Sequence, residues 1–322
     1  MNLTPSFLVV DKPPGITSHD VVDVIRAVTG VRKVGHTGTL DPFATGVLPL
    51  ALGHATKLIQ FLDESVKIYE ALIRFGSATD TGDPTGEVIE ERPLPDADEA
   101  RVDEVLATFL GDSLQTPPAY SAVKHKGKPL YHYARKGVDV QVEARPITIT
   151  GMERLAYDGQ TLSVRITCSR GTYARVLAQD IADALGSAGH LEQLARTRSG
   201  PFVLEDAVDF PTLGALVSAD PGRTWQEVLL KRGRKEERVP WRPRDDVRAA
   251  LGDRIRSPLD ALSHLPLAEV SGTDAGRIRK GGDLPAAPAG AVVGGRYLIV
   301  CGAEIIGVAE HTARGPKPVK VL

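Results

Sequence analysis

Residues 35–57 read GHTGTLDPFATGVLPLALGHATK, and this run contains one carboxylate, Asp41, among apolar, hydroxyl and glycine residues. Placed before Pro42, Asp41 fits a turn in which an aspartate caps its own backbone. A lone carboxylate also suits nucleophilic or base catalysis better than the two-carboxylate scheme of glycosidases. A ligand could approach the backbone closely here, because small residues surround Asp41: Gly35, Thr37, Gly38, Thr39, Thr45 and Gly46.

The composition of the 322-residue chain is that of an ordinary globular protein, with 42% hydrophobic and 25% charged residues. This length fits one large domain or two unequal ones. The formal net charge is -2, so only local clusters of charge could indicate a nucleic-acid partner. Two distant cysteines, Cys168 and Cys301, exclude a disulfide framework and a Cys-rich zinc site. The sequence predicts no signal peptide and no membrane span, so we expect a cytoplasmic protein.

Residues 6–206 alternate between strand and helix patterns. A helix is predicted over 18–30, with Ser18 as candidate N-cap and Gly30 just past its end. A second helix is predicted over 96–112 with Asp96 as N-cap, and a third, amphipathic one over 171–186. The predicted strands are SFLVVDKPPG (6–15), IYEALIRFG (68–76), GHLEQLARTRSGPF (189–202) and a hairpin about Asp158-Gly159.

Three further residues are candidates for chemistry, and each has a structural alternative. His36 could bind a ligand or make a loop hydrogen bond. Tyr69 lies on an alternating strand, where a tyrosine is more often a core residue than a catalytic one. Arg175 lies beside the buried stripe of its helix, where its fork needs a carboxylate; an exposed helix arginine is the alternative. No metal-ligand spacing and no P-loop motif accompanies them, so no metal site is predicted.

A basic, tyrosine-rich segment occupies residues 120–136 and contains no acid. One-sign charge with stacking surfaces is typical of nucleic-acid contact, and a solvated loop is the alternative. Residues 231–256 hold ten Lys/Arg against five Asp/Glu, and we interpret 213–256 as an irregular or partly helical connector. Short Gly, Val and Ile runs in 262–322 suit a small β-barrel.

Six segments, in this order, closely resemble the bacterial tRNA pseudouridine-55 synthase family: LVVDKPPGITSHD, GHTGTLDPFATGVLPLALGHATK, YEALIRFGSATDTGDPTG, PPAYSAVKHKGKPLYHYARKG, CSRGTYARVLAQDIADALG and GHLEQLARTRSGPF. The resemblance is strong from residue 7 to about 206. It is looser in the tail, where GVAEHTARGPKPVKVL (307–322) resembles a PUA domain. HTGTLDP and GTYARVL together are a highly specific signal.

The resemblance implies an isomerase that detaches a uracil from its ribose and rejoins it through carbon 5, without cofactor or metal. It implies that Asp41 is the catalytic carboxylate and that Arg175 pairs with it, offsetting the raised pKa of a buried acid. It also implies that Tyr69 stacks on a flipped-out target base and can serve in proton removal. The implied pocket positions are His36, Tyr173 and Leu194. The implied RNA-binding positions are Lys12, Lys124, Lys126, Lys128, Tyr131, Arg135 and Lys136.

The predicted fold is α+β, with a pseudouridine-synthase domain over residues 1–212. That domain is expected to contain a mixed, largely antiparallel sheet, flanking helices and an RNA-gripping insertion at about 117–146. A basic connector, 213–261, and a small PUA-like β-barrel, 262–322, are expected to follow. The sequence departs from the family in a longer, more basic connector and in an Ala/Pro/Gly-rich stretch at 285–294.

The rival interpretation is a non-catalytic tRNA-binding or tRNA-folding chaperone. An ionised acid next to an anionic backbone repels it, so a pure binder has no use for Asp41. A metal-free hydrolase lacks a Ser/His/Asp or Cys/His constellation. We expect a monomer whose partner is the T-arm stem-loop of tRNA, with no protein partner implied.

Overall fold

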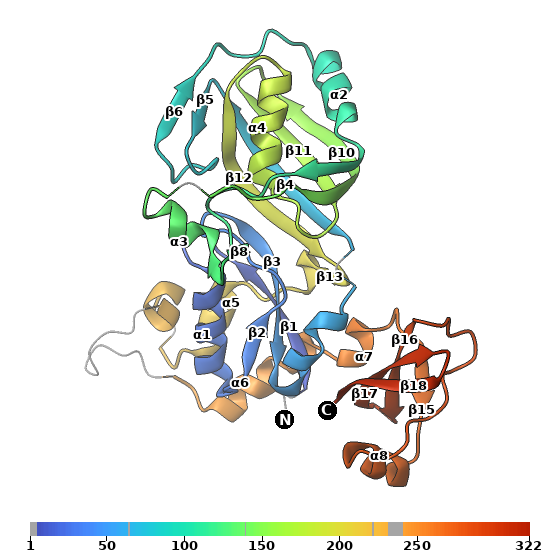
Figure 1. The fold of residues 1–322 in the computed structure, drawn as a ribbon. Coiled ribbons are helices and arrows are strands. Elements are labelled where there is room, and N and C mark those ends of the chain that lie inside the picture. The colour runs from blue at the N-terminus through green and yellow to red at the C-terminus, as the bar shows by residue number, and fades with distance from the viewer. Residues whose placement is uncertain (1–4, 64, 139, 221, 231–240) are drawn as a thin grey trace.

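The computed structural model describes residues 5–63, 65–138, 140–220, 222–230 and 241–322, and a ten-stranded sheet forms its centre. Eight strands follow in the order β14-β1-β3-β12-β4-β11-β10-β7, while β2 pairs with β3 and β13 with β12 (Figure 1). Among these strands β12 and β3 run parallel and the other pairs antiparallel, which confirms a mixed, largely antiparallel sheet. The strands are β1 (Ser6–Lys12), β2 (Val34–His36), β3 (Thr45–Leu52), β4 (Lys67–Phe75), β7 (Gly111–Gln115), β10 (Arg145–Tyr157), β11 (Thr161–Cys168), β12 (Gly189–Ser199), β13 (Phe202–Val203) and β14 (Ile255–Arg256).

One apolar core joins a layer of helices to this sheet. The alternation of buried and partly exposed side chains is clearest on β4, whose residues are buried at every second position, as the sequence predicts. Leu8 and Val10 of β1 belong to the same core. The helices that contribute to it are α1 (Ser18–Thr29), α2 (Glu99–Thr108), α4 (Ala174–Ala184), α5 (Phe210–Val217) and α6 (Arg244–Ala250).

Two helices begin at a cap other than the predicted one. The N-cap of α1 is Thr17, which forms a capping box with Asp20, because the Ser18 hydroxyl is used in a contact with Leu40. The N-cap of α2 is Asp98, whose side chain accepts a hydrogen bond from the N–H of Arg101, so the prediction of Asp96 is two residues early. Gly30 ends α1 in the left-handed region at φ 70°, as predicted.

Part of the segment predicted as a connector is built into the helix and strand layers. Strand β14 extends the edge of the main sheet by pairing with Phe7 and Leu8 of β1. Helix α6 packs against α1, and the Nε of Arg248 donates to the carbonyl of Thr29 at the end of α1, 2.8 Å away. Residues 231–240, the most basic part of the connector, lie outside the described residues.

A second sheet of four strands lies beside the main one, in the order β15-β16-β17-β18 (Figure 1, lower right). Its strands are β15 (Leu267–Glu269), β16 (Arg296–Cys301), β17 (Glu304–Thr312) and β18 (Gly315–Val321), with α8 (Gly272–Arg279) packed on it. The described strands form an open sheet, so the closed β-barrel expected here is not found among them. An apolar core continuous from β1 and β3 through α7 (Pro258–Ala261) into β16 and β17 holds the two sheets together.

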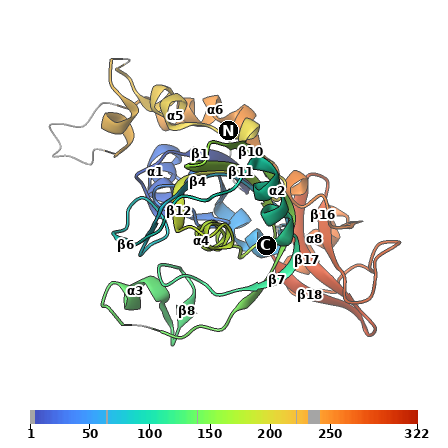
Figure 2. The same cartoon turned by 90° about the horizontal axis from the view of Figure 1, so that it is seen from above.

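The segment between β7 and β10 leaves the main sheet and forms the structure that we call the insertion, residues 116–144. It contains a short hairpin of β8 (Lys124–His125) and β9 (Lys128–Pro129), followed by α3 (Leu130–Ala134). Figure 2 shows α3 and β8 on the side of the molecule opposite α5 and α6. No helix in the described part of the chain is long and apolar enough to cross a membrane.

Candidate active site

The loop that carries Asp41 connects β2 to β3, and neighbouring elements hold its backbone in place. The Ser18 hydroxyl at the start of α1 accepts a hydrogen bond from the N–H of Leu40, at 2.9 Å, and donates to its carbonyl at 3.1 Å. On the other side of Asp41, the Nζ of Lys12 donates to the carbonyl of Pro42, 3.0 Å away. The carboxylate is therefore presented by a loop fixed on both of its flanks.

Asp41 and Arg175 form the ion pair that the sequence analysis anticipates. The Nε of Arg175 lies 2.9 Å from Oδ2 of Asp41 and Nη2 lies 3.3 Å from Oδ1, which is the bidentate geometry that suits a guanidinium. The side chain of Arg175 is only 5% exposed, whereas that of Asp41 is 33% exposed. The arginine is thus a buried support, and the carboxylate keeps one side open to a substrate.

Arg175 also ties two other loops to the same point. Its Nη1 donates to the carbonyl of Thr81, at 2.9 Å, and its Nη2 donates to the carbonyl of Tyr120, at 2.8 Å. Gly82 passes so close that a Cβ there would lie 3.3 Å from the Cβ of Arg175. One guanidinium thereby joins the Asp41 loop, the loop after β5 (Ser77–Thr79) and the start of the insertion.

Burial and nearby charges compete to set the pKa of Asp41. Burial is the larger influence and raises this pKa, while the charge of Arg175 and its hydrogen bond lower it. The carboxylate of Asp83 raises it further, and the ammonium of Lys12 lowers it. The net result is a pKa above the ordinary value, so Arg175 limits the loss of ionisation that burial alone would cause.

Tyr69 lies on β4 next to this pair and is almost fully buried. Burial raises the pKa of its phenol, and the charge of Asp41 acts in the same direction. Arg196 acts in the opposite direction, through its charge and through a polar contact with the phenol. Arg196 and Tyr69 are register partners on β12 and β4, so sheet pairing brings them together.

The other predicted pocket residues lie on the elements around Asp41. His36 ends β2, and its Nδ1 is buried without a hydrogen-bond partner among the described residues. Burial lowers the pKa of His36, and the charge of Arg196 adds to this effect. Tyr173 is the N-cap of α4, and the amide of Gln115 both accepts from its N–H, at 2.7 Å, and donates to its carbonyl, at 3.1 Å. Leu194 is 7% exposed on β12.

Lys12 is wrongly predicted as an RNA contact. Its side chain is fully buried, and Nζ donates to the carbonyls of Pro13, Ile16 and Pro42 at 2.9, 2.8 and 3.0 Å. All three ammonium hydrogens are therefore used within the protein, and none remains for a phosphate. Burial lowers the pKa of Lys12 to about 8. The residue supports the Asp41 loop, and its burial could not be read from the charged motif DKPPG.

The other predicted RNA contacts all lie on the insertion and are exposed. Lys126 and Gly127 occupy the hairpin tip with φ values of 47° and 82°, a geometry that turns the chain and directs basic residues outward. The guanidinium of Arg135 lies over the ring of Tyr131 at 5.4 Å. The exposed residues are Lys124, Lys126, Lys128, Tyr131, Arg135 and Lys136.

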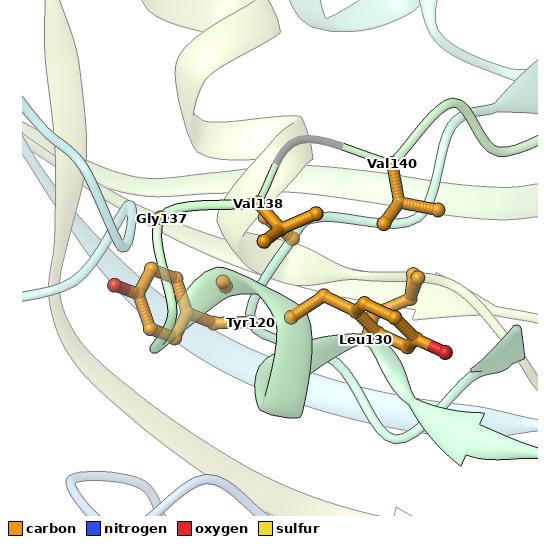
Figure 3. A pocket seen from close by; sticks show the side chains of 8 residues that line it. Tyr120, Leu130, Gly137, Val138 and Val140 are labelled. Carbon is orange, nitrogen blue, oxygen red and sulfur yellow. The ribbon is translucent and has the colours of Figure 1, made fainter.

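A hollow of about 240 Å³ lies at the base of the insertion (Figure 3). Its lining includes Leu130 and Tyr133 from α3 together with Tyr120, Val138 and Val140. The carbonyl of Tyr120 also accepts the hydrogen bond from Arg175, so the wall of this hollow is joined directly to the active-site arginine. In the part of the chain that the structure describes, no group of three His, Cys, Asp or Glu side chains is arranged to hold a metal ion.

Two supports of the site are absent from the sequence-based candidates. Ser18 is predicted only as a helix cap, and Arg196 is not singled out at all. Arg196 is 1% exposed. It lies in the stretch LARTRSG, whose other polar and charged residues are typical of a half-buried strand, so the sequence pattern does not distinguish it from an exposed arginine. A buried arginine cannot be told from an exposed one by alternation alone.

Comparisons with known proteins agree with this geometry. Residues 26–174 match the profile described as TruB family pseudouridylate synthase (N terminal domain). A protein of Aromatoleum aromaticum named tRNA pseudouridine synthase B is 42% identical over 316 residues, covering 98% of this chain and 91% of that protein. A protein of the same name from Azoarcus sp. is 39% identical, covering 98% of this chain and 94% of that protein.

Solved structures are similar over almost the whole chain. A chain of the crystal structure of a Cbf5-Nop10-Gar1 complex has a TM-score of 0.67 and 26% identity, covering 99% of this chain and 85% of that one. A chain of an H/ACA RNP bound to a substrate RNA containing 2'-deoxyuridine has a TM-score of 0.68 and 24% identity, which supports the fold alone. The similarity extends beyond the catalytic region to the C-terminal sheet, because nearly all of the chain is covered in both cases.

Proposed function

This chain belongs to the TruB family of pseudouridylate synthases, and on that premise we propose that it isomerises uridine-55 in the TΨC arm of tRNA to pseudouridine. The full-length similarity to proteins named tRNA pseudouridine synthase B supports the substrate class. The observation that carries the proposal is the partly exposed carboxylate of Asp41, held by two of the three guanidinium nitrogens of a buried arginine.

The reaction breaks the bond between N1 of uracil and C1′ of ribose and makes a bond from C5 to C1′. Asp41 acts as an ionised carboxylate against the bound nucleoside, whether it attacks C6, attacks C1′ or assists elimination. Arg175 keeps that carboxylate ionised and oriented, because its fork occupies fixed positions on both oxygens. The C5 hydrogen leaves as a proton, its electron pair returns to the ring, and N1 takes up a proton, so the product is an isomer.

Tyr69 stacks on the target base and serves in removal of the C5 proton, a role that its position beside Asp41 supports. A uridine inside a folded T arm cannot reach a carboxylate at the end of a sheet, so we propose that the base is flipped out of its stack. His36, Tyr173 and Leu194 then line its pocket and replace the stacking that the flipped base loses.

The insertion holds the RNA through its exposed cations and Tyr131, since phosphate contacts position a nucleic acid without reading its sequence. We propose the domain division 1–212, 213–261 and 262–322, with the last segment acting as a PUA-like RNA-binding unit. The resemblance of residues 307–322 to a PUA domain supports that assignment, and the solved structures are similar over this region as well. The protein would act as a cytoplasmic monomer.

Tritium release from a T-arm stem-loop that carries 5-tritiated uridine tests the function. Wild type is expected to release tritium, because forming the C5 bond expels that hydrogen, and Asp41→Asn is expected to bind the RNA without releasing it. Glu104→Gln, an exposed carboxylate on α2, is the matched control and should behave as wild type. RNA binding without tritium release by wild type would instead support a tRNA-folding chaperone.

A further inference from the structure

We infer that Arg196 is a positioning residue of this active site: it joins the two ends of the Asp41 loop and sets the Tyr69 phenol for proton transfer. This inference rests on the proposed function, and it concerns a buried side chain that the sequence motifs do not mark. Three independent observations support it, namely its burial, its hydrogen bonds and its place in the sheet.

The burial of Arg196 needs an explanation. It is among the largest fully buried side chains, at 1% exposure, and none of the ion pairs among the described residues involves it. Placing a guanidinium in a protein interior without a carboxylate is expensive, and a buried charge of this kind usually has a specific task. By contrast, Arg175 is buried against Asp41, so its charge is compensated.

The hydrogen bonds of Arg196 show what it holds. Its Nε donates to the carbonyl of Val47, at 2.8 Å, and its Nη2 donates to the carbonyl of Gly38, at 3.1 Å. These two residues lie on either side of Asp41, one before it in the loop and one after it in β3. The planar guanidinium of Arg196 therefore fixes the distance between the two ends of the loop. A lysine ammonium, on a flexible side chain and with its charge at one point, would not fix this distance.

The place of Arg196 in the sheet explains how it also reaches Tyr69. Strand β12 lies between β3 and β4, and Arg196 is the register partner of Gly46 on one side and of Tyr69 on the other. Its charge acts on Tyr69, His36 and Lys12, so one cation influences titratable groups on three different strands.

The consequence concerns the step in which the C5–H bond breaks. The phenolate form of Tyr69 takes the proton from C5 and becomes the neutral phenol, which later gives a proton to solvent, while the electron pair of the C5–H bond restores the double bond of the ring. The charge of Arg196 opposes the effect of burial on the pKa of Tyr69, so it makes the phenolate form, which can accept the proton, easier to reach.

Arg196→Met tests the inference, because it removes the charge and the donors while keeping much of the volume. We expect kcat for the T-arm stem-loop to fall on the order of 10²-fold, the lower end of what a positioned proton-transfer group contributes, with little change in KM. The deuterium isotope effect on kcat with 5-deuterated uridine should rise, because proton removal becomes slower than the other steps. The absorbance titration of Tyr69, taken as the difference from a Tyr69→Phe protein, should move to higher pH.

Arg198→Met is the matched control, since Arg198 lies two residues along β12, is exposed and donates to the carbonyl of Gly200. Arg196→Lys keeps the charge without the fork, so the titration of Tyr69 should stay near that of wild type while kcat falls. This second variant also serves if the methionine protein does not fold. An unchanged isotope effect and an unchanged Tyr69 titration, with activity lost only in proportion to stability, would overturn the inference. Absence of tritium release by wild type would instead refute the proposed function.

Discussion

The carbonyl oxygen of Arg196 lies only 2.2 Å from the point that a Cβ on Gly46 would occupy, so the two strands meet where a side chain is excluded. Gly46 also has φ 99°, a backbone region that disfavours residues with a Cβ. Because backbone rather than a flexible side chain is in the way, the contact cannot relax locally. This close approach brings β12 against the start of β3, directly after the loop that carries Asp41.

Gly46→Ala is therefore expected to destabilise the fold by more than about 3 kcal/mol and to lower activity with it. Urea unfolding followed by circular dichroism measures the effect. Gly159→Ala is the control, because Gly159 has φ 85° but open space around it, and only the cost of its backbone conformation should appear. Similar losses in both variants would show that the contact with Arg196 does not matter.

Replacing Arg175 should separate catalysis from RNA binding. Arg175→Met leaves Asp41 without its partner and the carbonyls of Thr81 and Tyr120 without donors, and breaking a buried ion pair costs about 3–5 kcal/mol. We expect tritium release to be lost while the affinity for the stem-loop, measured at equal fractions of folded protein, changes little. A variant that keeps full activity would show that the ion pair is not needed.

The acid side of the activity profile should reflect Asp41. Its pKa is raised by burial, so kcat should decline at a higher pH than an ordinary aspartate would give. For stability the direction is opposite: the contribution of Asp41 to the free energy of unfolding is fully present below its unfolded pKa and is lost as pH rises through the raised folded pKa. Arg175→Lys should move the decline of kcat to still higher pH. A decline at the pH of a free aspartate would contradict the burial of Asp41.

Lys12→Met should weaken folding rather than RNA binding. It removes the donors for three buried carbonyls, which predicts a loss of about 1–3 kcal/mol, while the salt dependence of stem-loop binding stays as in wild type. Burial lowers the pKa of Lys12 to about 8 from 10.5, so folding releases a proton and the contribution of Lys12 to stability rises with pH between these values. Unfolding of both proteins across that range measures the difference. If Lys12→Met reduced the slope of log K against log salt, this result would show that Lys12 does contact RNA.

Replacing a cation of the insertion should weaken RNA binding and not folding. Lys126→Ala at the hairpin tip is expected to lower affinity and to reduce the slope of log K against log salt by about 1, because one phosphate contact is lost. At saturating RNA, kcat should stay near that of wild type. Binding titrations at several salt concentrations measure the slope, with Arg101→Ala on α2 as the control, because Arg101 is an exposed cation outside the insertion and the C-terminal sheet. An unchanged slope would exclude Lys126 from the RNA contact.

Much of this architecture could be predicted from local pattern. The alternation of β4, the stop of α1 at Gly30 and the hairpin at Gly159 follow from side-chain period and turn chemistry, which act within a few residues. The cap of α1 is Thr17 and not the predicted Ser18, because the Ser18 hydroxyl bonds to Leu40, a residue distant in sequence. When neighbouring residues are equally suited to cap a helix, a tertiary contact of this kind decides which of them becomes the cap.

Residue type indicates only that Arg175 needs a carboxylate, while the family resemblance implies that this carboxylate is Asp41, and the structure contains that pair. The burial of Lys12 and Arg196 could not be predicted, because both are charged residues in segments that also carry exposed charges. Their burial follows from carbonyls that converge from separate loops, and no sequence pattern records that convergence.

The apolar core shared by β1, β16 and β17 has a consequence for how the chain is made. Phe7 and Val9 are synthesised almost 300 residues before Leu298 and Ile305, which belong to the same core. At about 5–20 residues per second, this face of the nascent sheet waits on the order of ten seconds or more for its cover. Cotranslational folding therefore proceeds with an exposed apolar surface, which is the kind of surface that a ribosome-associated chaperone recognises.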